Sequence, residues 1–205
     1  VSRSRGLASI RPAVGLLTPP PFATAMTSQA PDISIIVAVY NTAEYLAPCL
    51  DSLVSQTHKA IEIICVDDCS TDASPGVLER YRRTDPRVVV VNLRENCGLS
   101  VARNKGLAIA RGRWICYIDS DDIAAANLCA RCLDVSRATS ADVVFYGYRY
   151  FHDGQPCVFG RASGECRPAD KSALLAGRSF SWIRMTSADL LKSRGIQFPP
   201  GLTQQ

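Results

Sequence analysis

Three carboxylates lie close together in the stretch WICYIDSDDI, which covers residues 114–123. Asp119 and Asp121 are separated by one serine, and Asp122 follows directly. Carboxylates this close oppose one another's ionisation unless a cation or hydrogen-bond donors offset their charge. A hard divalent cation can be held by one or two carboxylates together with waters and substrate phosphates. The cluster is therefore either a solvated loop or a site for a divalent cation.

Polar residues also follow other apolar runs that are typical of strands. Tyr40 and Asn41 follow ISIIVAV, and Asp68 follows IEIICVD, where it could accept a hydrogen bond from a base or a ribose. Arg103 lies at the entry to a predicted helix, where it could contact a phosphate oxygen. Taken singly, DxD is often a turn or a helix cap, Asp68 an Asx turn and Arg103 a surface residue. Their joint position at strand ends favours a metal and a nucleotide.

The usual phosphate-binding loops are absent from the sequence, which contains neither GxxxxGK[ST] nor GxGxxG. A nucleotide would therefore have to be held by carboxylates and a metal ion. A metal that bridges a diphosphate makes it a better leaving group, because the ion neutralises the charge that develops on it.

The elements that must position these residues alternate along the chain. Continuous apolar, β-branched runs are typical of strands buried on both faces, and five are expected at residues 32–41, 61–68, 87–93, 113–119 and 141–148. Helices are expected from residue 44 or 45, around 77–81, after a Gly-containing loop capped by Ser100, and over 123–138. This alternation predicts an α/β fold, a mostly parallel sheet with helices on both faces. In such sheets ligands bind outside the carboxyl ends of the strands.

Charge and composition divide the chain. Residues 1–31 contain three arginines and no acid, so they supply most of the net charge of +4. The nearly neutral remainder argues against a nucleic-acid partner. We expect residues 1–31 to be disordered or an upstream, targeting-like segment, with the ligand-binding core at 32–150 and a further region at 151–205. No run approaches the roughly 18 apolar residues of a membrane span, which favours a cytoplasmic protein.

The chain contains nine cysteines. An odd number in a chain of this length does not favour a disulfide framework, and Cys129 with Cys132 forms one CxxC without a second pair or a nearby histidine. Zinc is therefore only weakly indicated. We expect small, buried, reduced thiols in a reducing cytosol.

Several stretches, in the same order, resemble glycosyltransferase family 2. ISIIVAVYN resembles that family's opening strand, YLAPCLDSLVSQT its first helix, and EIICVDDCSTD its second strand and acidic turn. NCGLSVARNKGL and YIDSDD resemble its later loop and its DxD signature. The resemblance covers roughly residues 32–150 and implies the GT-A fold, a Rossmann-like α/β architecture. It also implies inverting transfer of a sugar from a nucleotide-diphospho-sugar, most often a UDP-sugar, to an acceptor hydroxyl.

The resemblance implies a role for each residue near the nucleotide. Asp68 would contact the base, Tyr40 and Asn41 would line the nucleoside pocket, and Arg103 would approach the nucleotide.

For the metal, the resemblance implies that Asp121 binds Mn²⁺ or Mg²⁺ and that Asp119 lies near both the ribose and the ion. The acceptor would be a saccharide, a lipid or a protein. A lipid or a growing polysaccharide as acceptor would allow peripheral association with the inner face of the membrane.

Three departures from the family pattern bear on activity. Ala38 stands where proline is usual, and Cys69 stands where glycine is usual, which would disfavour a left-handed turn there. The stretch SWIRMTSADLLKSRGIQFPPGL resembles the segment before the family's catalytic base, but no acid follows Asp189. We therefore expect the base beyond Gln205, a truncated acceptor-side region at 151–205, and impaired transfer.

Two alternatives remain open. A nucleotide-sugar-binding remnant without catalysis would equally lack the base. An aspartyl phosphotransferase also ends a strand in DxD, but this sequence lacks the usual threonine two residues after Asp121, and little chain follows Ile123.

Overall fold

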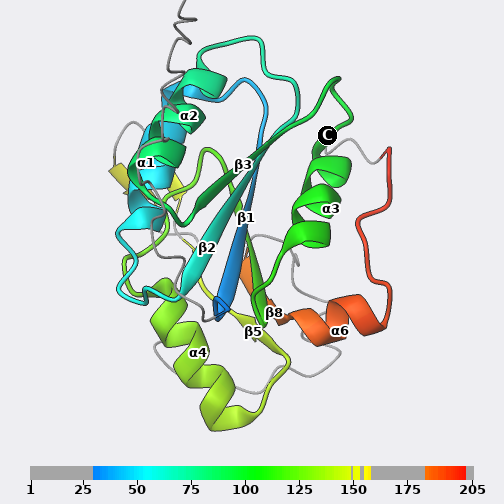
Figure 1. Cartoon of the computed structure of the whole chain (residues 1–205). Coiled ribbons are helices and arrows are strands. Elements are labelled where there is room, and N and C mark those ends of the chain that lie inside the picture. The colour runs from blue at the N-terminus through cyan, green and yellow to red at the C-terminus, as the bar shows by residue number, and fades with distance from the viewer. Residues whose placement is uncertain (1–29, 149, 153–154, 158–182, 202–205) are drawn as a thin grey trace, which may run out of the picture.

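Six strands form the central sheet of the computed structural model, which describes residues 30–148, 150–152, 155–157 and 183–201 (Figure 1). The strands are β1 (Ile33–Val39), β2 (Ile61–Asp67), β3 (Val88–Asn92), β4 (Trp114–Asp119), β5 (Val143–Phe145) and β8 (Arg184–Ser187). A separate two-stranded sheet pairs β6 (Tyr150–His152) with β7 (Gln155–Cys157). The N-terminal segment for which disorder or targeting is predicted lies, up to residue 29, outside the described residues.

The strand order across the central sheet is β3-β2-β1-β4-β8-β5. The four neighbours from β3 to β4 pair in parallel, whereas β8 pairs antiparallel with both β4 and β5. The prediction of a mostly parallel sheet is thus confirmed, since the four predicted strands from β1 to β4 are the parallel ones.

The strand β8 was not predicted from the sequence. Its four residues, RMTS, are too few to show a strand period, and their partners lie far away in the sequence. Trp114 pairs with Ser187, and Val143 pairs with Thr186, so the strand exists through two long-range ladders. The strand predicted at 141–148 is correspondingly short, because only three of its residues pair with β8.

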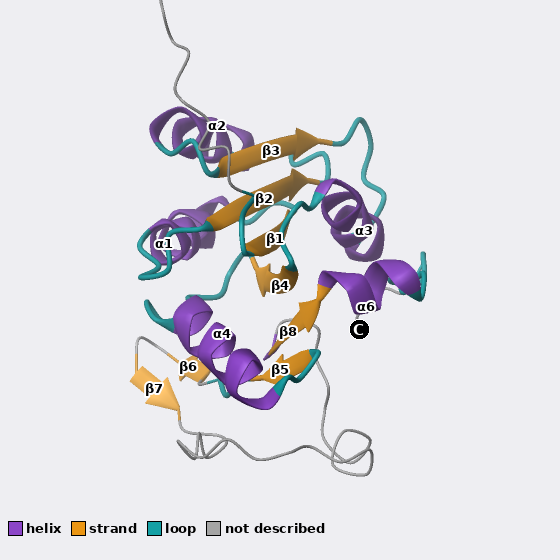
Figure 2. Cartoon of the chain, turned by 60° about the horizontal axis from the view of Figure 1, so that its bottom comes forward, coloured by secondary structure: helices purple, strands orange, loops and turns teal. Residues whose placement is uncertain are grey.

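Helices cover both faces of the sheet, as predicted. They are α1 (Ala43–Val54), α2 (Ser74–Thr84), α3 (Leu99–Ile109), α4 (Leu128–Thr139) and α6 (Ala188–Ser193). Viewed along the strands, α1, α2 and α4 lie on one face and α3 and α6 on the other (Figure 2). The alternation of β1 explains this division: Ile35 and Val37 pack in the layer of α1, α2 and α4, and Ile36 packs in the layer of α3 and α6.

Three helix boundaries differ from those predicted. Helix α1 begins at Ala43, one residue before the earlier of the two predicted starts, and Pro48 lies inside it. Helix α3 is preceded by Gly98, whose φ of 87° favours glycine, and Ser100 lies within the helix instead of capping it. Helix α4 begins at Leu128 rather than near residue 123, because the amide of Ala124 in the preceding loop donates to Ser52 of α1.

Most of the cysteines in the described part of the chain pack as small apolar side chains. Seven are free thiols, and five of these are buried: Cys49, Cys65, Cys116, Cys129 and Cys132. Burial raises the pKa of Cys116 to about 11, which keeps its thiol protonated and unreactive at neutral pH. Separately, none of the described helices is both long and apolar enough to span a bilayer.

A buried carboxylate joins three elements at the amino-terminal edge of the parallel strands. Glu62 on β2 accepts hydrogen bonds from the Ser34 hydroxyl (2.6 Å) and from the Arg111 amide (2.7 Å) and guanidinium (2.9 Å). The amide of Gly112 donates in turn to the Ser34 hydroxyl at 2.8 Å. Burial would raise the pKa of Glu62, but these hydrogen bonds and the charge of Arg111 bring it below its ordinary value.

The variant Glu62→Gln should lower the free energy of unfolding at neutral pH by about 2 kcal/mol, because a neutral amide replaces an acceptor of charge-assisted hydrogen bonds. The pKa of folded Glu62 lies below that of the unfolded chain. Its contribution is therefore present above the unfolded pKa and is lost as pH falls through the folded pKa. Urea unfolding at several pH values down to about pH 3 should show the difference between wild type and variant shrinking. A difference that stays constant would contradict this account.

Candidate functional site

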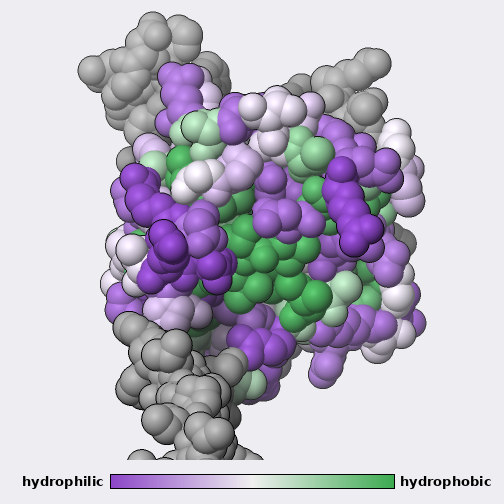
Figure 3. All heavy atoms as spheres, turned by 45° about the horizontal axis from the view of Figure 1, so that its top comes forward, coloured by the Kyte–Doolittle hydropathy of each residue, from purple (hydrophilic) through white to green (hydrophobic). Residues whose placement is uncertain are grey.

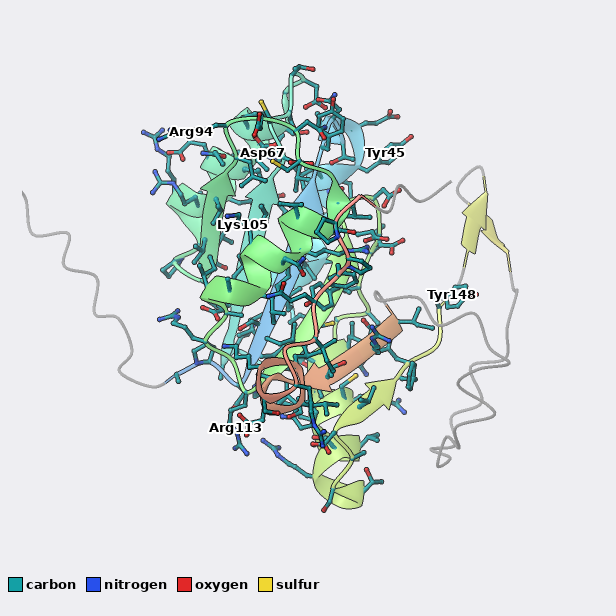
Figure 4. The ribbon with its side chains drawn as sticks, turned by 90° about the vertical axis from the view of Figure 1, so that its right-hand side faces the viewer. Tyr45, Asp67, Arg94, Lys105, Arg113 and Tyr148 are labelled. Atoms are coloured by element: carbon teal, nitrogen blue, oxygen red, sulfur yellow. The ribbon has the colours of Figure 1, made fainter. Side chains whose placement is uncertain are left out.

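The order of the strands reverses at β1, because β2 and β3 lie on one side of it and β4 on the other. Ligands of α/β sheets bind at such a reversal, outside the carboxyl ends of the strands. The register places Ala38 beside Asp119 and Val39 beside Asp67, so β1, β2 and β4 end at one level. Figure 4 shows Asp67 at this edge and Arg113, which precedes β4, at the opposite edge.

A pocket of about 430 Å³ lies at the carboxyl edge of the sheet. The face of the molecule turned forward in Figure 3 shows an apolar patch surrounded by polar side chains. Four predicted site residues share the wall of the pocket: Tyr40, Asp68, Asp119 and Asp121. The sequence analysis did not select the other lining residues, which are Ala38, Val39, Thr42, Asn96, Gly98, Leu99, Ala102 and Ser120.

Most of the lining residues that were not predicted are small or apolar, and the sequence around such residues gives no sign that they line a ligand pocket. The family-like stretch NCGLSVARN did carry a usable signal, because a glycine that opens a helix permits close approach of backbone to a ligand. Gly98 and Leu99 line the pocket from this position.

Asp68 is buried and fixes the loop that enters α3. One of its carboxylate oxygens accepts a hydrogen bond from the amide of Cys97, and the other accepts one from the amide of Gly98, each at 2.7 Å. These bonds hold the loop against the end of β2. A carboxylate has further lone pairs, so Asp68 can still accept a hydrogen bond from a ligand.

Asn41 does not line the pocket, although it directly follows Tyr40. Its backbone has a φ of 52°, and its side-chain oxygen accepts hydrogen bonds from the amides of Thr71 (2.8 Å) and Asp72 (3.3 Å). Asn41 therefore ties the turn after β1 to the loop after β2. The neighbouring ring of Tyr40 is 47% exposed at the pocket wall.

Arg103 also lies outside the pocket lining, where its guanidinium is bound by protein groups. It is 3% exposed and donates to Asp119 at 2.6 Å. The ring of Phe198 lies 5.2 Å from the guanidinium carbon and makes an edge-to-face contact with Tyr117. Asn104, the next residue on α3, exchanges two hydrogen bonds with the backbone of Phe198. The structure thus places Arg103 as the partner of Asp119.

The three carboxylates at the end of β4 are only partly neutralised. Burial raises the pKa of Asp119, and the nearby charge of Arg103 limits that rise. Burial also raises the pKa of Asp122 to about 6, and the charges of Asp119 and Asp121 add to the rise. Asp121 is exposed at the pocket wall.

Two oxygen ligands on one wall suit a hard divalent cation, which would relieve the repulsion between the carboxylates. Within the described ranges, no three His, Cys, Asp or Glu side chains converge on a point that could hold a metal. The residues therefore fit an ion that completes its shell with water and substrate oxygens.

Comparison with known families shows to which family the chain belongs. The family model described as glycosyl transferase family 2 matches residues 34–161. The chain belongs to that family. Membership of family 2 leaves no support for an aspartyl phosphotransferase. The matched residues include the strand ends that carry the pocket.

Among curated relatives, this family-2 chain is 36% identical over 178 residues to EpsH of Bacillus subtilis (strain 168), which covers 83% of the chain and 51% of EpsH. Among solved structures it resembles residues 1–349 of TarS from S. aureus, with a TM-score of 0.72 and 28% identity, covering 84% of this chain and 52% of that one. The same TarS segment in complex with UDP-GlcNAc matches with a TM-score of 0.68 and 25% identity, covering 83% and 49%.

The mannosyltransferase PcManGT of Pyrobaculum calidifontis, in complex with GDP-Man and Mn²⁺, has a TM-score of 0.63 at 23% identity, covering 85% of this chain and 49% of that one. That likeness shows the fold alone. The GT-A fold is thereby confirmed for the described core, and the chain spans about half the length of the relatives it matches.

Cys69, which stands where the family usually has glycine, adopts the left-handed backbone that glycine favours, with a φ of 63°. Cys69→Gly should therefore raise the free energy of unfolding by about 0.5–1 kcal/mol, since relief of roughly 1–2 kcal/mol of strain exceeds the entropic cost of glycine. Chemical denaturation measures the change. Cys97→Gly is the matched control, because Cys97 has a negative φ and its replacement should destabilise. Equal changes in the free energy of unfolding for the two substitutions would show that the backbone at Cys69 is not strained.

Proposed function

We propose that this family-2 glycosyltransferase binds a nucleotide-diphospho-sugar, with UDP as the nucleotide, in the pocket at the carboxyl edge of the sheet. Together with Mn²⁺ or Mg²⁺, it would transfer the sugar to an acceptor hydroxyl with inversion. The observation that carries the proposal is the convergence of Tyr40, Asp68, Asp119 and Asp121, from three strand ends, on one pocket. The TarS structure with UDP-GlcNAc supports UDP as the nucleotide.

The nucleoside end of the donor fits the side of the pocket formed by Tyr40 and Asp68. The exposed ring of Tyr40 offers a face for a base to stack on, and such stacking contributes about 1–3 kcal/mol per base. Asp68 is held rigid by two backbone amides and can accept a further hydrogen bond from a base N–H. Asn41 would act indirectly, by keeping the turn that carries Tyr40 in place.

The diphosphate end fits the side formed by Asp119 and Asp121. Asp119 has one oxygen bound to Arg103, which leaves the other for the ribose or the ion. Asp121 is exposed, and no described residue donates to its carboxylate, so it is the better metal ligand. When bound, the ion would neutralise charge on the departing diphosphate. Arg103 would serve this end by orienting Asp119 rather than by contacting phosphate.

The attacking hydroxyl must also lose its proton, and the described residues assign no group to that step. Donor binding is therefore the part of the function that these residues support most directly.

Donor binding can be tested by isothermal titration calorimetry with UDP and Mn²⁺. The wild-type chain should bind UDP more tightly with Mn²⁺ than with EDTA, because the ion joins the carboxylates to the diphosphate. Asp121→Asn should weaken Mn²⁺-dependent binding by about tenfold or more, the loss typical when a single metal contact is impaired. The control Asp134→Asn changes an exposed aspartate on α4 and should leave binding unchanged. Absence of UDP binding by the wild-type chain would refute the proposed function.

A further inference from the structure

The loop between β4 and α4, residues 120–127, carries Asp121 and is attached to α1. It is not helical, although residues 123–126 are IAAA, a sequence with three good helix formers. The amide of Ala124 donates to the Ser52 hydroxyl at 3.0 Å, and the amide of Thr57 donates to the carbonyl of Ala126 at 2.8 Å. The loop therefore owes its path to bonds with α1 and the residues that follow α1.

Gln56 makes the central contact of this attachment. Its side chain is fully buried and donates to the carbonyls of Ser52 (3.1 Å) and Ala125 (2.8 Å). Its carbonyl oxygen accepts from the amide of Cys129 in the first turn of α4, at 3.1 Å. One amide group thus joins the end of α1, the middle of the loop and the start of α4.

Cys49 and Ser52 lie three residues apart on one stripe of α1, and Gln56 follows two residues after the helix ends at Val54. The thiol of Cys49 donates to the carbonyl of Asp119 at 3.5 Å, which extends the attachment to the end of β4. None of the three side chains lines the pocket. Polar side chains on the buried face of a helix cost free energy unless each is bonded, and here every one is bonded.

We propose that Gln56 and Ser52 are positioning residues, which hold the 120–127 loop so that Asp121 faces the donor diphosphate and its metal. The proposal rests on the proposed function. Repulsion among the three carboxylates at the end of β4 would push the loop outward before an ion arrives. Bonds from α1 to the loop backbone oppose that movement, so the metal-binding geometry exists in advance.

The variants Gln56→Met and Ser52→Ala test the proposal, because each removes loop bonds with little change of volume. In the presence of UDP, the Mn²⁺ concentration for half-maximal binding should rise about tenfold in Gln56→Met and less in Ser52→Ala. The affinity for UDP in EDTA should stay unchanged, since Tyr40 and Asp68 do not depend on the loop. Hydrogen exchange of peptides spanning 120–128 should become faster in both variants.

Glu62→Gln is the matched control, because it alters an equally buried, multiply bonded side chain at the opposite edge of the sheet. It should lower stability without changing the Mn²⁺ requirement or the exchange of the 120–127 loop. Unchanged Mn²⁺ requirement and loop exchange in both test variants would overturn the positioning role while wild-type UDP binding stands. Equal shifts in Glu62→Gln would also overturn it, since general destabilisation would then suffice. A wild-type chain that binds no UDP would instead refute the proposed function on which the proposal rests.

Discussion

The pairing of β1 with β2 on one side and with β4 on the other is the constraint on which the site depends. Parallel ladders of six or seven residues fix the ends of the three strands at one level. A slip by one residue would turn every side chain of a strand to the opposite face, which would disrupt its packing against the helices on both sides and move Asp119 away from Ala38. Core packing on both faces of the sheet therefore also sets the geometry of the pocket.

The carboxylates of Asp68, Asp119 and Asp121 at the carboxyl edge of the sheet have different hydrogen-bond partners, and each therefore has a different role. Asp68 accepts one hydrogen bond on each oxygen from a backbone amide and thereby fixes the loop that enters α3. Asp119 is oriented by the guanidinium of Arg103. Asp121 projects from a loop whose backbone is held by α1, and it keeps its own oxygens open to solvent. Of the three, only Asp121 receives no hydrogen bond from a described residue, so it has the most capacity left for a metal ion.

Carboxylates at the two edges of the sheet have different roles: at one edge a carboxylate stabilises the fold, and at the other carboxylates are proposed to bind a ligand. At the amino-terminal edge, the carboxylate of Glu62 accepts hydrogen bonds from a hydroxyl, an amide and a guanidinium, so its charge is compensated by groups of the protein itself. At the carboxyl edge, Asp119, Asp121 and Asp122 crowd together while Arg103 bonds to Asp119. Because the fold leaves part of this negative charge uncompensated, binding of a cation would relieve the repulsion between the carboxylates. The proposed metal site is a consequence of that imbalance.

The sequence by itself determined the parallel core and the identity of the polar residues at its edge. Strands such as ISIIVAV and IEIICVD are buried on both faces, so their composition reveals them without partners. Because the carboxyl ends of parallel strands meet at one edge, Tyr40, Asp68 and Asp121 could be expected together.

Tertiary structure alone decided what each side chain does there. Arg103 turned out to face Asp119, Asn41 to hold a turn, and Gln56 to anchor a loop some seventy residues further along the chain. The strand β8 likewise exists only through its distant partners. The physical reason is the same in each case: backbone period and hydrophobicity are local and leave a local pattern, whereas hydrogen bonds between distant segments depend on how the elements pack.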